Sequence, residues 1–233
     1  MSEKWFEGPL LGFDTETTGV DVGSDRIVQA ALVTVEPDDR GGRQDRVWLI
    51  DPGVPIRPEA SRVHGITDAQ VRESGAEPGP ALSQIAAELS AAIEAEVPLV
   101  LFRAGFDLTM LSHELDRHGI PQPDWGKAAV IDPAVLDKRV DRYRKGKRTL
   151  GVTARYYGVV LEEAHSAAAD AAATVELARA IGGRYPEVGA LDPRDLHESQ
   201  VRWHAEDAAS LEAYFRRSGR NARVERRWPL ARD

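Results

Sequence analysis

Four acidic residues and one histidine, spread over three separated segments, are of the types that metal-assisted phosphate chemistry uses. Asp14 and Glu16 follow a short apolar run. Asp107 follows a second apolar run, and Asp170 stands five positions after His165. Carboxylates placed together repel one another and raise one another's pKa, so divalent cations greatly lower the cost of gathering them. Two cations held by acidic side chains, with a histidine nearby, can hydrolyse a phosphodiester bond.

Each segment alone also has an ordinary structural explanation. Asp14 and Glu16 are two apart at the end of an expected strand, so they share a face and suit one hard cation or a polar turn. Asp107 lies where a strand gives way to a helix, which is also the place of a helix N-cap. Asp170 falls in the first turn of an alanine-rich helix, where a negative charge is favourable. The order of all three segments in one chain favours a shared site.

Apolar and β-branched runs predict the elements that must position these residues. Strands are expected at 10–13, 27–35, 47–50, 99–102 and 128–131, with a further edge strand at 224–230. Helices are expected at 81–97, 108–118, 133–140, 150–157, 167–181 and 196–217. Three antiparallel strands followed by alternating helices and strands predict an α/β fold with a mixed five-stranded sheet flanked by helices.

Composition limits the class of protein. The chain has 233 residues, 42% of them hydrophobic, which suits one globular domain with an appendage. We expect a catalytic domain over 8–185 and a C-terminal helical extension over 194–233 that packs on it, with the boundary in 186–193. Cysteine is absent, and we find neither a signal peptide nor an apolar stretch of about 20 residues, so a cytoplasmic protein without a membrane span is expected. The net charge of −8 argues against coating of nucleic acid by bulk charge.

Five motifs together resemble one family. They are FDTETTG at 13–19, VHGIT at 63–67, AGFDL at 104–108, GKRTL at 146–150 and HSAAADA at 165–171. In this order they resemble the DnaQ-like 3′–5′ exonucleases that carry an Asp-Glu-Asp-Asp set with a histidine, within the ribonuclease H-like fold. The likeness spans roughly residues 10 to 182.

The resemblance implies a two-metal site. Asp14, Glu16 and Asp170 would hold a first cation, and Asp14 would bridge to a second, which Asp107 assists through water. His165 would act as the general base, because its pKa lies near working pH. All the ligands are carboxylates, so Mg²⁺ or Mn²⁺ is expected, with two ions per site.

The resemblance also implies a substrate-binding set. Its members are Thr15, Thr17, His64, Arg103, Phe106, Lys147 and Arg148. Arg103 departs from the family, which usually has asparagine at this position. A guanidinium there can bind a phosphate, repel the cations or point to solvent.

The implied activity is removal of nucleoside 5′-monophosphates from the 3′ end of single-stranded DNA. The alternatives are an exoribonuclease acting on short RNA or RNA 3′ ends, and a nucleic-acid-binding module whose catalysis Arg103 impairs. Recruitment by a polymerase or repair partner and pairing into a homodimer stay open. Six arginines form a basic tail that would extend a nucleic-acid path, at positions 216, 217, 220, 223, 226 and 227.

Overall fold

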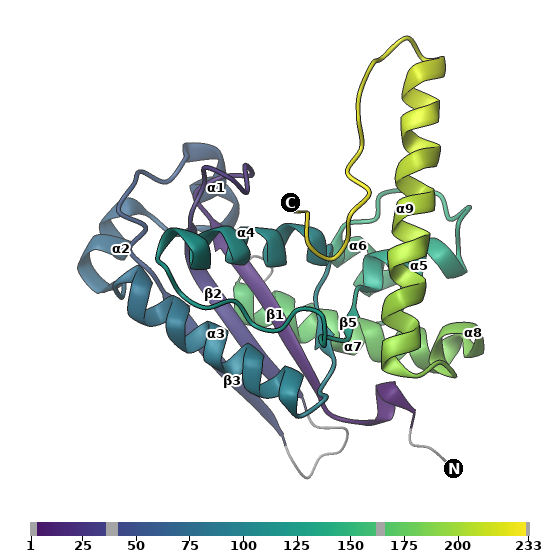
Figure 1. The fold of residues 1–233 in the computed structure, drawn as a ribbon, viewed down its shortest axis with the longest axis horizontal. Coiled ribbons are helices and arrows are strands. Elements are labelled where there is room, and N and C mark those ends of the chain that lie inside the picture. The colour runs from purple at the N-terminus through teal and green to yellow at the C-terminus, as the bar shows by residue number, and fades with distance from the viewer. Residues whose placement is uncertain (1–3, 36–41, 162–165, 232–233) are drawn as a thin grey trace.

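The computed structural model describes residues 4–35, 42–161 and 166–231, which form a five-stranded mixed sheet covered by helices (Figure 1). The strands are β1 (Leu10–Thr17), β2 (Ile27–Val35), β3 (Arg43–Leu49), β4 (Leu99–Val100) and β5 (Val130–Ile131). Their order across the sheet is β3-β2-β1-β4-β5. The first three strands pair antiparallel, and β4 and β5 pair parallel to β1 and to each other. The predicted α/β class and mixed five-stranded sheet are confirmed.

The central strand β1 continues beyond the apolar run that predicted it. The sequence predicts a strand over 10–13, whereas the pairing of β1 with β2 runs from Leu10 to Thr17. Asp14 and Glu16 therefore lie within the strand, where its backbone hydrogen bonds hold them in place. Alternate side chains point to opposite faces of a sheet, so both carboxylates share a face with Leu10.

Helices cover both faces of the sheet (Figure 1). One face is covered by α7 (Ala167–Arg184), which packs on β1 and β2. The other is covered by α3 (Pro78–Glu94) and α4 (Ala104–Arg117), whose apolar side chains share a core with Leu11 and Phe13 of β1. The remaining helical segments are η1 (Trp5–Glu7), α1 (Pro58–His64), α2 (Asp68–Ser74), α5 (Pro133–Val140), α6 (Leu150–Tyr156), α8 (Pro186–Gly189) and α9 (Pro193–Arg217). None of the helices in the described ranges is long and apolar enough to cross a bilayer.

Gly12 sets how closely α7 approaches β1. A Cβ atom at this position would lie 2.8 Å from the carbonyl oxygen of Ala171 and 2.9 Å from Cγ2 of Val175. Such distances are below van der Waals contact, so a larger residue would push the helix away from the strand. Asp170 directly precedes Ala171, and the contact therefore also fixes how near Asp170 comes to the carboxylates of β1.

The C-terminal region corrects the prediction of an edge strand at 224–230. Residues 224–230 form no strand, and instead return irregularly to α4, where Trp228 is 5% exposed and packs in the main core. Burial of this indole against Gly105 and His197 replaces sheet pairing. The expected boundary at 186–193 contains α8, whose Val188 is buried and accepts a hydrogen bond from Trp5 Nε1 at 3.1 Å. This stretch therefore packs on the body.

Two short helices, α1 and α2, were not predicted. Each has seven residues, and α1 buries none of them, so the sequence carries no apolar period that would reveal it. The α2 helix begins with a capping box in which Thr67 and Gln70 satisfy each other's backbone amides.

Substitution of Gly12 tests the close contact between β1 and α7. We expect Gly12→Ala to lower the free energy of unfolding by about 1–3 kcal/mol, because the added methyl group meets helix backbone. The matched control is Gly183→Ala in α7, where a Cβ meets only a Phe6 ring atom at 3.8 Å, an ordinary contact, and should stabilise slightly. Urea unfolding of both variants measures this, and equal stability of the two would contradict the packing account.

Candidate active site

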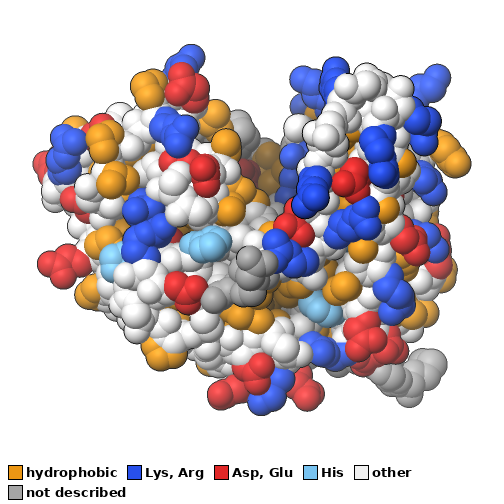
Figure 2. Space-filling view, turned by 45° about the horizontal axis from the view of Figure 1, so that its top comes forward, with side chains coloured by type: hydrophobic (Ala, Val, Ile, Leu, Met, Phe, Trp, Pro, Cys, Tyr) orange, Lys and Arg blue, Asp and Glu red, His pale blue; other side chains and the backbone are white. Residues whose placement is uncertain are grey.

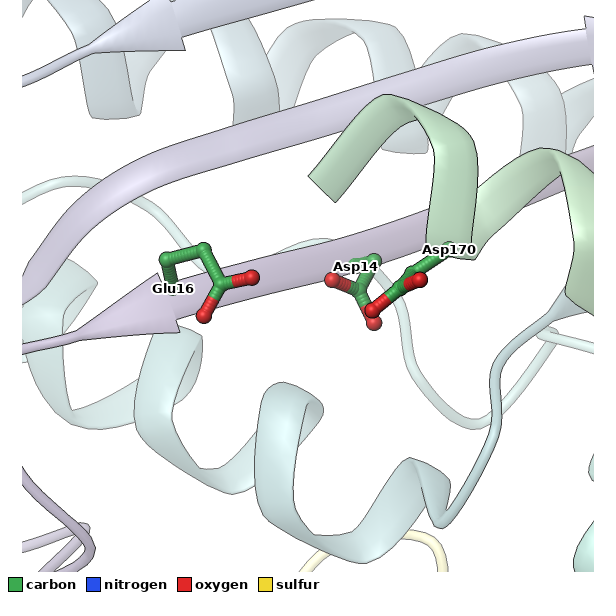
Figure 3. Close-up of side chains that lie close together, drawn as sticks. All are labelled: Asp14, Glu16 and Asp170. Carbon is green, nitrogen blue, oxygen red and sulfur yellow. The ribbon is translucent and has the colours of Figure 1, made fainter. Parts of the chain in front are cut away.

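Three carboxylates from two elements meet beside the central strand. Asp14 and Glu16 come from the same face of β1, and Asp170 comes from the first turn of α7 (Figure 3). One oxygen of each lies within 4.8 Å of the others, which is close enough for a single cation to touch all three. The alanines around Asp170 and the glycine at position 12 permit this approach. The sequence-predicted convergence of these three residues is thus present in the structure.

Asp107 joins the cluster from the opposite helical layer through Thr15. The Asp107 side chain is buried, and its Oδ1 accepts hydrogen bonds from Thr15 Oγ1 at 2.6 Å and Thr15 N at 3.1 Å. Thr15 lies between Asp14 and Glu16 in the strand, so these bonds hold the Asp107 carboxylate next to the pair. The Thr15 hydroxyl therefore orients an acidic group, and the substrate contact that the resemblance implies for Thr15 stays a prediction.

The cluster has strongly perturbed acidities. Burial raises the pKa of Asp14 well above its usual value, and three neighbouring carboxylates raise it further. Burial, followed by the charges of Asp170 and Asp107, raises the pKa of Glu16 to about 8. Burial also raises the pKa of Asp107 to about 7, although hydrogen bonds from Thr15 oppose the shift. Without a cation these groups retain protons near neutral pH, and an all-carboxylate set fits a hard divalent cation that would replace those protons.

Asp132 fixes the start of the helix that carries Asp107. Its buried carboxylate accepts hydrogen bonds from the backbone N–H groups of Arg103 and Ala104, both at 3.0 Å, and from Ala134 N at 2.9 Å. It thus caps α4 and α5 together. Gln200 of α9 accepts from Asp132 N at 2.8 Å, which the Asp-Pro dipeptide at 132–133 does not reveal.

His64 and Thr17 support the end of β1. Nδ1 of His64 accepts from Ile66 N at 3.0 Å, so in the neutral ring the proton lies on Nε2, which is 3.2 Å from the carbonyl oxygen of Thr17. The buried Thr17 hydroxyl donates to Gly19 O at 2.6 Å. These bonds place the half-buried His64 beside the strand that carries the acidic pair.

Arg103 begins α4 in an unusual conformation. Its φ of 64° and ψ of 50° lie in the left-handed region, which asparagine adopts more readily than arginine. The side chain is exposed, Nη2 donates to Arg148 O at 3.3 Å, and the guanidinium lies 6.0 Å from the ring centre of Phe102. Phe106, one turn along, is half-buried and lines a cavity between α4 and α9.

The basic segment before α6 divides into a structural and an exposed part. Arg148 forms an ion pair with the buried Asp137, which Arg144 also binds through Nη2 at 2.6 Å. Lys147 is exposed. The Arg148 guanidinium therefore anchors this segment to α5, while Lys147 faces solvent. His165, the predicted general base, lies outside the described residues.

The raised pKa values predict that the free energy of unfolding depends on pH in the absence of divalent cations. Glu16 titrates at 4.5 in an ordinary environment and at about 8 here, so between these values the folded protein holds a proton that the unfolded chain has lost. The contribution of Glu16 to the free energy of unfolding is fully present below the lower pKa. It is lost as the pH rises through the higher pKa.

We therefore expect the free energy of unfolding in EDTA to fall by about 1–3 kcal/mol across this window, after allowance for solvent screening. Urea titrations at several pH values measure it. Glu16→Gln should flatten the profile, and Glu73→Gln on the exposed surface of α2 should not. A free energy of unfolding that rises with pH in the native protein would contradict the clustering of the carboxylates.

The part of the chain that carries this cluster is similar in sequence to a protein family and to several DNA polymerase III proteins. Residues 11–178 match the family model RNase_T, described as exonuclease. The chain is 33% identical over 168 residues to a DNA polymerase III subunit epsilon-like protein of Rhodobacter capsulatus, a match that covers 70% of this chain and 22% of that protein. It is 32% identical over 175 residues to a PolC-type DNA polymerase III of Streptococcus thermophilus, covering 73% of this chain and 11% of the polymerase.

Solved structures show the same fold. One structure of exonuclease I superposes with a TM-score of 0.63 at 20% identity, covering 88% of this chain and 46% of that one. A structure of E. coli exonuclease I in complex with a dT13 oligonucleotide gives a TM-score of 0.59 at 21% identity, covering 77% and 42%. Because the family model spans most of the sequence and the sheet has the expected order, the chain belongs to the exonuclease family, in its DnaQ-like group with the ribonuclease H-like fold.

Proposed function

We propose that this chain is a divalent-metal-dependent 3′–5′ exonuclease that removes nucleoside 5′-monophosphates from single-stranded DNA. The observation that carries the proposal is the meeting of Asp14, Glu16 and Asp170 within 4.8 Å in a chain of the exonuclease family. A buried acidic cluster costs stability unless a cation is bound, so a role in cation binding explains why the fold tolerates it.

The residues divide the work of hydrolysis. Asp14, Glu16 and Asp170 would hold one Mg²⁺ or Mn²⁺, and Asp14 with Asp107 would hold a second. When bound, these cations supply Lewis-acid stabilisation of the phosphate charge and favour ionisation of the attacking water. Thr15 keeps Asp107 oriented through its hydroxyl and its amide.

His165 would remove a proton from the attacking water. The water oxygen forms a new bond to the terminal phosphorus while the bond from phosphorus to the 3′ oxygen of the preceding nucleotide breaks. The leaving 3′ oxygen takes a proton from solvent, so the products are a nucleoside 5′-monophosphate and a strand shortened by one nucleotide, with a new 3′ hydroxyl.

DNA is favoured as the substrate by the names of the relatives. Two are DNA polymerase III proteins, and solved structures of exonuclease I hold dT13 and dA16 oligonucleotides. RNA is the alternative, since the family model carries the name of an RNase and discrimination depends on contacts to the 2′ hydroxyl. Matched DNA and RNA strands decide between them.

Digestion of labelled strands tests the activity and its polarity. With Mg²⁺ or Mn²⁺, we expect a 3′ label to be released at once as a mononucleotide and a 5′ label to pass through a ladder of shortened strands. EDTA should stop both. Asp14→Asn should reduce turnover by at least about 10²-fold, because it removes a charged ligand from the cation site.

Asp45→Asn on the exposed edge strand β3 is the matched control, with the same change of charge and unaltered turnover. Release of internal fragments, release from the 5′ end, or full activity in EDTA would each contradict the proposal.

Arg103 tests whether the departure from the family pattern impairs catalysis. The Arg103 side chain is exposed, and its guanidinium donates to Arg148 O. We therefore expect Arg103→Asn to raise KM by loss of a phosphate contact, to leave kcat within about twofold, and to stabilise the fold by up to about 1 kcal/mol. Steady-state kinetics and urea unfolding measure both effects. A large rise in kcat would instead show that Arg103 slows catalysis.

A further inference from the structure

The last third of α9 and the segment that follows it project from the body as an arm, which we define as residues 210–227. Every buried residue of α9 lies at or before Ala208. Beyond that point the helix continues for nine residues, about 14 Å, without covering any core. Figure 1 shows this part of α9 and the returning chain standing away from the rest of the molecule.

The arm is tied together and anchored at both ends. Arg226 forms an ion pair with Glu212, and Nε2 of His204 lies 3.2 Å from the carbonyl oxygen of Glu225, so the returning segment is joined to the helix. At the far end Trp228 is buried in the main core, and Ala231 N donates to Thr109 Oγ1 of α4 at 3.0 Å. These contacts therefore make the arm an ordered part of the fold.

The charge of the arm opposes that of the chain. Residues 210–227 contain six arginines and two glutamates, in a protein with a net charge of −8. Figure 2 shows Lys and Arg side chains gathered over the arm, beside the hollow that separates it from the side of the molecule formed by α1 and α2. A local excess of arginine in an acidic chain favours a polyanionic ligand.

Aromatic side chains lie among the arginines. Tyr214 is 56% exposed, and its ring centre lies 6.1 Å from that of Phe215. Exposed aromatic rings within a basic surface stack the unpaired bases of a single strand, which a protein or lipid ligand does not offer.

A cavity of about 520 Å³ lies at the base of the arm, between α9 and the start of α4. Its lining is mostly apolar and includes Leu211 of the arm, Trp228, and Arg103 with Phe106 at the start of α4. Asp107 directly follows Phe106, so the helix that lines this cavity also carries one of the four carboxylates.

We propose that the arm and the cavity at its base bind single-stranded nucleic acid on the 5′ side of the scissile nucleotide. The arginines contact phosphates, Tyr214 stacks a base, and the cavity takes up a nucleotide between the arm and the carboxylates. This rests on the proposed exonuclease activity for the direction of the strand. It predicts that strands long enough to reach the arm are bound more tightly than shorter ones.

Binding is measured by fluorescence anisotropy in the Asp14→Asn background, which separates affinity from cleavage. The probes are DNA and RNA strands of about 20 and about 4 nucleotides, each over a series of salt concentrations. The test variant replaces Arg217, Arg220 and Arg223 by alanine. The control replaces Lys4, Arg46 and Lys127, three exposed cations on other elements, so the change of net charge is equal.

For the longer strands, we expect the arm variant to lower the slope of log affinity against log salt by about 2, because three phosphate contacts are lost. The control should keep the native slope. Arg→Lys at the same three arm positions should restore most of the affinity, and Tyr214→Ala should weaken binding without changing the slope. Unfolding in urea checks that each variant is folded.

Equal slopes and affinities for the native protein and the arm variant would overturn the proposal and leave the arm as a surface for another class of partner. The outcome is independent of the proposed activity. If binding depends on the arm but the chain with Asp14 intact shows no Mg²⁺-dependent cleavage, only the proposed activity is contradicted. If the chain cleaves but binding does not depend on the arm, only the proposed role of the arm is contradicted.

Discussion

The close packing of α7 on β1 is the contact on which the candidate site depends. Gly12 leaves no side chain between strand and helix, and Ala171 and Val175 occupy the space that any Cβ would need. This brings Asp170 against two carboxylates that the strand already presents on one face. The favourable free energy of core packing thus offsets the repulsion within the cluster, and a bound cation would remove that repulsion.

A second set of contacts brings Asp107 from the other side of the sheet. Thr15 donates both its hydroxyl and its amide to Asp107, while Asp132 receives the first amides of α4. Asp132 is itself held by Gln200 of α9. The helix at the base of the arm and the helix that carries a catalytic candidate therefore share one buried carboxylate. Binding of a nucleic-acid strand at the arm and positioning of Asp107 at the acidic cluster would therefore involve connected parts of the fold.

The sequence predicted the parts of this structure that follow a short-range pattern. The alternation of side chains in a strand placed Asp14 and Glu16 on one face, and the alanines around Asp170 indicated a helix that approaches closely. The link between Thr15 and Asp107 spans 92 positions and has no periodic signal, so the sequence did not predict it. The edge strand expected at 224–230 was wrong because the burial of Trp228 outweighs local strand preference.

The central claim is that carboxylates from separate elements share divalent cations. Calorimetric titration with Mn²⁺ in buffers of different ionisation enthalpy measures both binding and the protons released. We predict saturable binding with release of at least about one proton near neutral pH, because the cations replace protons held by Glu16 and its neighbours. Asp170→Asn should weaken binding sharply. Absence of Mn²⁺ binding, or equal affinity in the native protein and Asp170→Asn, would contradict the account.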